Sequence, residues 1–217
     1  DIVLANPPYS IKTWDREAFM NDKWGRNFLG TPPQGRADYA FFQHILASMN
    51  EETGRCAILF PHGVLFREEE QEMRKVLVKK DLIECIIGIG KNLFYNSPME
   101  ACIIICNTHK SQERQSKILF INAKDDVTRK NGESYLEEKH IEKVSSAYHN
   151  YSIIDGFSSV IDNAVVLANN AKLSIAQYVK PISSDDISSV EDCVVAWKEA
   201  SGSLNKEIEN LLNCIEV

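Results

Sequence analysis

The residues best suited to chemistry lie near the start of the chain, where Asn6-Pro7-Pro8-Tyr9 follows a short apolar run, residues 2–5. The run is typical of a buried strand, and two successive prolines make the loop after it stiff, because each fixes φ and lacks an N–H donor. The Asn6 side-chain carbonyl and the Pro7 backbone carbonyl can each accept one N–H of an amino group on a flat heteroaromatic ring. Tyr9 can stack on that ring, a contact worth roughly 1–3 kcal/mol per base. A plain turn is the alternative, because Asn-Pro and Pro-Pro also punctuate chains.

This arrangement suits methylation of an exocyclic amine. When two acceptors bind the two N–H groups of one NH₂, the nitrogen lone pair is favoured out of conjugation with the ring. A nitrogen in that state is nucleophilic. No strong base is required, because the proton is lost after the nitrogen attacks an electrophilic methyl group. In open α/β sheets, ligands bind outside the carboxyl ends of the strands, which is where Asn6–Tyr9 falls.

The remaining pattern predicts the elements that must position this loop. Apolar, β-branched runs alternate with helical periodicity, which indicates an α/β fold with a largely parallel sheet. Three runs that follow one another without a helix indicate that one end of the sheet turns antiparallel, with residues 117–121 as its last strand. Arg36 and Asp38, after a long loop over residues 10–35, fit a helix-capping pair. Strands are predicted at 2–5, 56–60, 82–89, 101–106 and 117–121, and helices at 37–50, 67–80 and 136–148.

Composition excludes several classes. Apolar residues make up 44% and charged residues 25% of the 217 residues, which is globular rather than disordered or fibrous. No apolar run is long enough to span a membrane, and no signal peptide precedes the first strand. The six cysteines form no CxxC pair and the histidines are dispersed, so we expect reduced thiols, a cytoplasmic protein and no metal site. His62 is the histidine to watch, because it lies in a loop at the site end of a strand.

The charge is unevenly distributed. Residues 81–217 carry the whole formal net charge of −7, and residues 1–80 are balanced. Such a chain is a poor stand-alone binder of nucleic acid, so a partner would have to supply positive charge. The loop over residues 10–35 interleaves Trp14 and Trp24 with basic residues, and it fits either a DNA-facing loop that orders on binding or a solvated charged loop.

The C-terminal segment has a heptad pattern of apolar residues instead of alternating strands and helices. Apolar positions separated by alternating steps of four and three predict a helix over residues 190–215 with a heptad seam. That seam fits either packing against the chain's own domain or docking on a partner. Its positions are Val190, Val194, Trp197, Ser201, Leu204, Ile208, Leu211 and Ile215.

Asn6–Tyr9 resembles motif IV of amino-methyltransferases, and further segments resemble the modification (methylation) subunits of type I restriction-modification systems. The resemblance runs from Asp1 to about Lys180 in the family's order. Its further segments are RADYAF (36–41), LFPHGVLFR (59–67), DLIE (81–84), NLFY (92–95), ACIII (101–105) and KILFINA (117–123).

The resemblance implies an adenine-N6 DNA methyltransferase that uses S-adenosylmethionine and flips its target base out of the duplex. Asn6 and Pro7 match the residues that bind the amino group, and Tyr9 matches the residue that stacks on the base. Phe94 matches the residue against the other face of the adenine, with Tyr95 as the substitute if the register slips by one. Core packing beside a strand is the alternative for both. The implied partners are DNA and the specificity and restriction subunits of the complex.

The family's glycine-rich cofactor loop would lie upstream of Asn6, so we expect this sequence to be a C-terminal half fragment of a longer protein. Asp1 is the single, weak candidate for a cofactor contact, and Gly88-Ile89-Gly90 lacks the third glycine of a dinucleotide fingerprint. We therefore expect S-adenosylmethionine to bind the intact protein and the fragment to be inactive. The expected division is the C-terminal part of a Rossmann-like methyltransferase domain (1–125), a family-specific α/β extension (126–185) and a helical tail (186–217). An RNA or protein-glutamine amino-methyltransferase and a non-enzymatic assembly module remain the alternatives.

Overall fold

The computed structural model describes residues 1–94, 98–130 and 133–180, together with residues 194, 195, 197, 198, 201 and 202. Residues 1–181 form one compact unit, and residues 182–217 form a second. The six described residues of the second unit have helical backbone. Most of the predicted helix over 190–215 lies outside the described residues, so its heptad seam stays a prediction.

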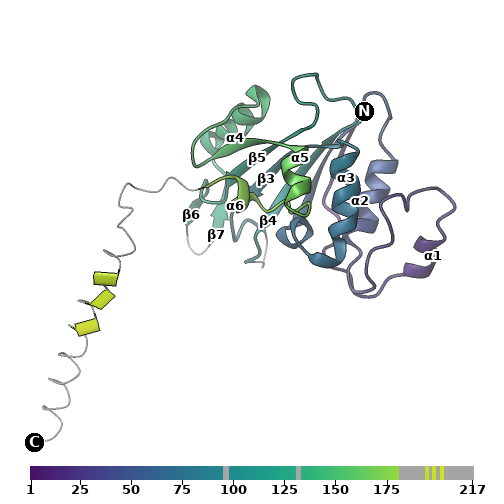
Figure 1. Ribbon diagram of the computed structural model, residues 1–217, viewed down its shortest axis with the longest axis horizontal. Coiled ribbons are helices and arrows are strands. Elements are labelled where there is room, and N and C mark those ends of the chain that lie inside the picture. Colours follow the sequence, from purple (N-terminus) through teal and green to yellow (C-terminus); the bar gives the residue numbers. More distant parts are fainter. Residues whose placement is uncertain (95–97, 131–132, 181–193, 196, 199–200, 203–217) are drawn as a thin grey trace, which may run out of the picture. The chain divides into compact units, whose positions relative to one another are not determined.

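A six-stranded sheet organises the first unit (Figure 1). Its order is β1-β2-β4-β3-β5-β8, in which β1, β2, β3 and β5 point the same way and β4 and β8 run against them. The α/β prediction of a mostly parallel sheet with antiparallel strands is confirmed. The strands are β1 (Ile2–Ala5), β2 (Arg55–Pro61), β3 (Ile83–Ile89), β4 (Ala101–Asn107), β5 (Lys117–Ala123) and β8 (Ser158–Asp162).

Helices cover both faces of this sheet unequally (Figure 1). Side chains of α2 (Asp38–Ala47), α3 (Gln71–Lys79), α5 (Asn163–Ala168) and α6 (Ile175–Tyr178) pack on one face, around a core that includes Phe42, Ile58 and Leu77. The other face packs against α4 (Glu138–Asn150) through Ala147. Leu4 of β1 is 79% exposed on this second face, beyond the reach of α4. The smaller elements are α1 (Arg16–Met20), the hairpin β6 (Thr128–Lys130) and β7 (Glu133–Tyr135), and the 3₁₀ turns η1 (His62–Leu65) and η2 (Glu68–Glu70).

The structure corrects one predicted element. The run 117–121 forms β5, but it is not the last strand, because β8 pairs antiparallel with its outer side. β8 was missed because its sequence, Ser-Ser-Val-Ile-Asp, holds only two apolar residues, and an edge strand needs few. β8 comes from the predicted extension 126–185 and belongs to the same sheet as the strands before residue 125.

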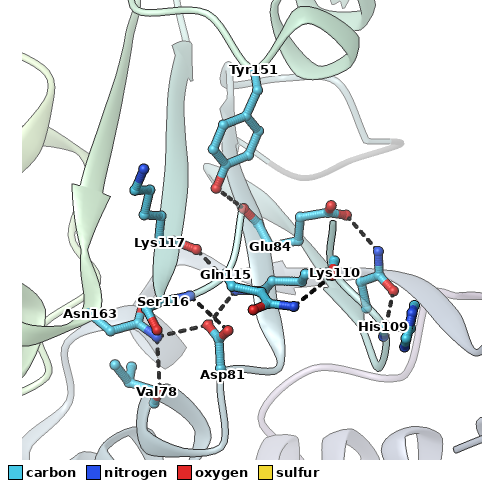
Figure 2. Close-up of polar contacts among 11 residues, drawn as sticks. Val78, Asp81, Glu84, His109, Lys110, Gln115, Ser116, Lys117, Tyr151 and Asn163 are labelled. Atoms are coloured by element: carbon cyan, nitrogen blue, oxygen red, sulfur yellow. Dashed lines mark hydrogen bonds and ion pairs between the residues drawn. The ribbon is translucent and has the colours of Figure 1, made fainter. Parts of the chain in front are cut away.

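The edge of the sheet where β3 and β5 begin is held by a buried polar network (Figure 2). Asp81 accepts hydrogen bonds from Lys110 Nζ at 2.6 Å, Asn163 Nδ2 at 2.8 Å and the backbone N–H of Ser116 at 2.8 Å. The ion pair with Lys110 satisfies both charges where the ammonium group is almost fully buried. This network joins α5 and the β4–β5 connection to the start of β3, so it stabilises the edge opposite to the one described next.

Candidate functional site

Three loops meet at the other edge of the sheet. Because parallel strands end at the same edge, the residues that follow β1, β2 and β3 lie together there. These are residues 6–10, 62–67 and 91–94. β4 runs the opposite way and begins at this edge, which adds residues 98–100. The topology therefore gathers segments from four strands around the loop that was singled out in the sequence.

A pocket of about 450 Å³ is lined by residues of the loops after β1 and β3 and of the segment before β4. The structure brings together Asn6, Pro7, Tyr9 and Phe94, four of the residues predicted from the sequence. Met99 also lines the pocket, together with Pro8, and no sequence signal distinguished it from a core methionine. Tyr95, the predicted substitute for Phe94, lies outside the described residues.

Asn6 and Tyr9 are bonded to each other across the turn. The Tyr9 hydroxyl donates a hydrogen bond to Asn6 Oδ1 at 2.9 Å. A carbonyl oxygen has two lone pairs, so this contact leaves Oδ1 able to accept a second donor. Burial raises the pKa of Tyr9 to about 12, so the hydroxyl keeps its proton at neutral pH. Pro7 beside them is buried, and the Asn6 side chain is exposed toward the pocket.

The residue after the motif is held by charged side chains from two other elements. Ser10 has a left-handed φ of 48°, which is rare outside glycine, and its N–H donates to Asp38 Oδ1 at 2.7 Å. Asp38 in turn accepts from Arg67 Nη1 at 2.6 Å. The capping prediction for Arg36 and Asp38 is wrong, because Asp38 is buried inside the first turn of α2 and no side chain caps that helix.

A second carboxyl belongs to the same cluster. Glu70 Oε1 lies 3.4 Å from Arg67 Nη1, and its side chain is fully buried. Burial raises the pKa of Glu70 to about 7, an effect that Asp38 reinforces and the guanidinium groups of Arg67 and Arg74 oppose. Glu70 stands in the acidic run Glu68–Glu70, and nothing in that run distinguishes the buried member from its two exposed neighbours.

His62 lies at the site edge but does not line the pocket. It opens the 3₁₀ turn after β2, and its Nε2 is buried without a hydrogen-bond partner among the described residues. Burial lowers the pKa of His62, so the ring is neutral at neutral pH.

The loop between Ser10 and α2 is tied down by its own contacts. Trp14 Nε1 donates to the Gln34 carbonyl at 2.7 Å, and Arg16 Nε donates to the Pro32 carbonyl at 2.9 Å. Arg26 forms an ion pair with Asp22, so one of the basic side chains of the loop is already neutralised. Trp24 remains 71% exposed with the Lys23 ammonium 5.0 Å from its ring centroid. Both interpretations of this loop, DNA-facing or solvated, therefore stay open.

Asp1, the weak candidate for a cofactor contact, does not join the pocket, and the structure explains Gly88 and Gly90 without a ligand. Asp1 precedes β1 and Asn6 follows it, so about 16 Å of extended chain separates them, at about 3.3 Å per residue. Gly90 is packed against the chain's own backbone, because a Cβ there would lie 2.5 Å from the Lys124 carbonyl oxygen. At Gly88 a Cβ would meet Ile175 at 2.8 Å. These glycines therefore serve close packing and do not cradle a ligand.

Two negative findings concern the described part of the chain. No group of three or more His, Cys, Asp or Glu side chains there is arranged to hold a metal ion. None of its helices has both the length and the apolarity that crossing a bilayer requires.

The family described as N-6 DNA Methylase matches residues 1–187. This chain belongs to the N-6 DNA methylase family. Among curated relatives, the chain is 35% identical over 193 residues to the type I restriction enzyme MjaVIII methylase subunit of Methanocaldococcus jannaschii, covering 86% of this chain and 33% of the relative. It is 31% identical to the MjaVII methylase subunit of the same organism, covering all of this chain and 39% of the relative. The chain thus spans between 33% and 39% of the length of these relatives.

Solved structures agree. The type I restriction-modification methyltransferase subunit from Streptococcus thermophilus superimposes with a TM-score of 0.76 at 32% identity, over 83% of this chain and 38% of that subunit. The EcoKI M protein superimposes with a TM-score of 0.58 at 15% identity over 97% of this chain and 48% of that one, which shows a shared fold. The resemblance to type I methylation subunits is therefore confirmed.

Proposed function

We propose that this chain supplies the base-binding part of an S-adenosylmethionine-dependent methyltransferase that modifies the N6 of adenine in DNA. It would do so within the modification subunit of a type I restriction-modification complex. One observation carries the proposal: in a member of the N-6 DNA methylase family, Asn6, Pro7, Tyr9 and Phe94 line a single pocket at the carboxyl ends of the strands.

Each of these residues has a distinct task in the proposal. Asn6 Oδ1 accepts one hydrogen bond from the Tyr9 hydroxyl and can accept a second from one N–H of the amino group. The other N–H of the amino group donates to the Pro7 backbone carbonyl. The rings of Tyr9 and Phe94 provide apolar walls for a flipped base, and such stacking is worth roughly 1–3 kcal/mol. The volume of about 450 Å³ lies in the range of small-molecule sites, roughly 300–1,000 Å³.

We propose that the described residues do not hold the methyl donor by themselves. Atoms of the chain itself occupy the space beside Gly88 and Gly90, and Asp1 lies at the opposite edge of the sheet. S-adenosylmethionine supplies an electrophilic methyl group where it is bound, and we place its binding site in the remainder of the complete protein, since the curated relatives are far longer than this chain. We expect residues 1–217 alone to bind the cofactor weakly and to methylate nothing. Calorimetry with the cofactor tests this, and micromolar binding would overturn it.

The decisive experiment replaces Asn6 in the complete modification subunit, assembled with its specificity subunit. Asn6→Ala should lower methyl transfer to target DNA by about 100-fold, which is typical when one preorganised hydrogen-bonding group is lost from a site. Asn150→Ala is the matched control, because that asparagine is exposed at the end of α4. Equal activity of the Asn6 variant and the control would refute the proposal.

Two variants of Tyr9 divide its contributions. Tyr9→Phe keeps the ring and removes only the hydrogen bond to Asn6, so a loss of about fivefold is expected, near 1 kcal/mol. Tyr9→Ala also removes the ring, so we expect a further loss of about tenfold from stacking.

The partners belong to the proposal as well. A net charge of −7 makes the chain a poor binder of DNA on its own, so we assign most of the positive surface, and the reading of the DNA sequence, to the specificity subunit. The restriction subunit is the other proposed partner. Residues 186–217 are the proposed tail, and deleting them from the complete subunit should weaken assembly measured by size-exclusion chromatography. Unchanged assembly would place the heptad seam against its own subunit.

A further inference from the structure

The loop that carries the amine-binding residues ends in a strained residue. Ser10 adopts φ 48° although it has a Cβ, a conformation that persists only when its surroundings stabilise it. Two side chains from distant parts of the sequence contact it. Asp38 accepts its N–H at 2.7 Å, and Arg67 Nη2 lies 3.4 Å from its hydroxyl.

These two residues are themselves bonded and almost fully buried. Arg67 Nη1 lies 2.6 Å from Asp38 Oδ2, and the side chains are 11% and 0% exposed. Asp38 thus uses one carboxylate oxygen for the loop and the other for the arginine. A charge-assisted pair of this kind is short and directional, and burial shields it from solvent screening.

The arginine is held in turn by the loop after β2. Arg74, which is fully buried on α3, donates from Nη1 to the Arg67 carbonyl at 2.8 Å. The Tyr39 hydroxyl donates to the Val64 carbonyl at 3.0 Å. Gly63 leaves room for the guanidinium group, since a Cβ there would lie 2.5 Å from Arg67 Nε. The pair therefore rests on rigid elements rather than on the mobile surface.

We propose that Asp38 and Arg67 are positioning residues that hold Ser10, and through it the Asn6–Tyr9 loop, in the geometry that receives the amino group. The inference rests on the proposed function, and it assigns tasks to two residues that do not line the pocket. Ser10 directly follows Tyr9, so a change at Ser10 rotates the end of the loop against the strand that anchors Asn6. A displacement near 1 Å is enough to reduce a reaction by about 100-fold.

Glu70 provides a matched comparison within the same cluster. It is as buried as Asp38 and also faces Arg67, but among the described residues no hydrogen bond joins it to Ser10. If the cluster merely supported the fold, a carboxamide at either position would change stability and leave the kcat of the folded protein unchanged. A positioning function predicts that only the carboxyl bonded to the loop affects the reaction.

The experiment uses the complete modification subunit with its specificity subunit. Asp38→Asn should lower kcat for methylation by 10- to 100-fold and change KM for DNA by less than threefold, whereas Glu70→Gln should stay within threefold of the native kcat. Gly63→Ala serves as the second variant. It keeps every charged residue and displaces the end of the Arg67 side chain, so we expect a kcat loss of at least fivefold when the assay is run at a temperature where the variant is fully folded.

The outcomes separate this inference from the proposed function. If Asn6→Ala keeps full activity, the proposed function fails. If Asn6→Ala loses activity while Asp38→Asn and Gly63→Ala retain the native kcat, only the positioning function is refuted. Equal losses of kcat in Asp38→Asn and Glu70→Gln would also refute it, because the hydrogen bond to Ser10 would then make no difference. Should Asp38→Asn fail to fold, the Gly63→Ala kcat decides.

Discussion

Burial of the Glu70 carboxyl makes a strong prediction about stability and pH. Its side chain is 0% exposed, one of its oxygens has no hydrogen-bond partner among the described residues, and burial raises its pKa from 4.5 to about 7. Arg67 and Arg74 favour the ionised form but do not offset burial, and the nearby Asp38 carboxylate disfavours it. We therefore expect Glu70→Gln, which imitates the protonated acid, to change the pH dependence of folding.

The sign and size of the pH effect on stability follow from the linkage between protonation of Glu70 and folding. Because the pKa is higher in the folded than in the unfolded state, the contribution of Glu70 to stability is fully present below pH 4.5 and is lost as pH rises to about 7. One pKa unit corresponds to about 1.4 kcal/mol, so the loss above pH 7 is roughly 3 kcal/mol. The glutamine variant has no such loss. Its free energy of unfolding relative to the native protein should therefore rise by roughly 3 kcal/mol between pH 4 and pH 8.

Chemical denaturation of both proteins at fixed pH values between 4 and 8.5 measures this difference. Carboxyl groups that do not interact with Glu70 titrate alike in both proteins and cancel in the comparison. Glu69→Gln is the control, because that residue is its exposed neighbour in the same 3₁₀ turn and should give a nearly flat difference. A Glu70→Gln difference that varies by less than about 0.5 kcal/mol across the range would show that the burial cost is absent.

Two further predictions concern the pocket and the opposite edge. Phe94→Ala in the complete subunit should reduce kcat/KM for target DNA by 5- to 30-fold, the equivalent of about 1–2 kcal/mol of stacking, and an unchanged value would remove Phe94 from the site. Lys110→Met keeps the apolar stem but leaves Asp81 without its ion pair, so urea denaturation should show a loss of about 2–3 kcal/mol, less than for a fully buried partner because Asp81 is 28% exposed. If Lys110→Met lowers the free energy of unfolding by the same amount in the Asp81→Asn variant as in the native protein, the two side chains are not energetically coupled.

The sequence was sufficient to single out the Asn6–Tyr9 loop and to indicate the class of fold. Asn6–Tyr9 is contiguous, and its position after an apolar run already places it at the carboxyl end of a strand. The strands that surround it are strongly apolar, and their periodicity predicts β2, β3, β4 and β5 close to their observed bounds. Phe94 was found through a family motif, and the structure places it in the same pocket as Tyr9.

The support beneath that loop could not be found in the same way. Asp38 has the sequence neighbourhood of a helix cap, and Glu70 stands in a run of three acidic residues of which the structure buries only one. What distinguishes Asp38 is contact with Ser10 and Arg67, which lie 28 and 29 residues away along the chain. What distinguishes Glu70 is its burial beside Arg67. Local patterns report which face of an element is apolar, because that property repeats along the chain. The pairing of charged side chains from distant parts of the sequence depends on the ends of strands β1 and β2 lying side by side. Only the folded sheet brings those ends together.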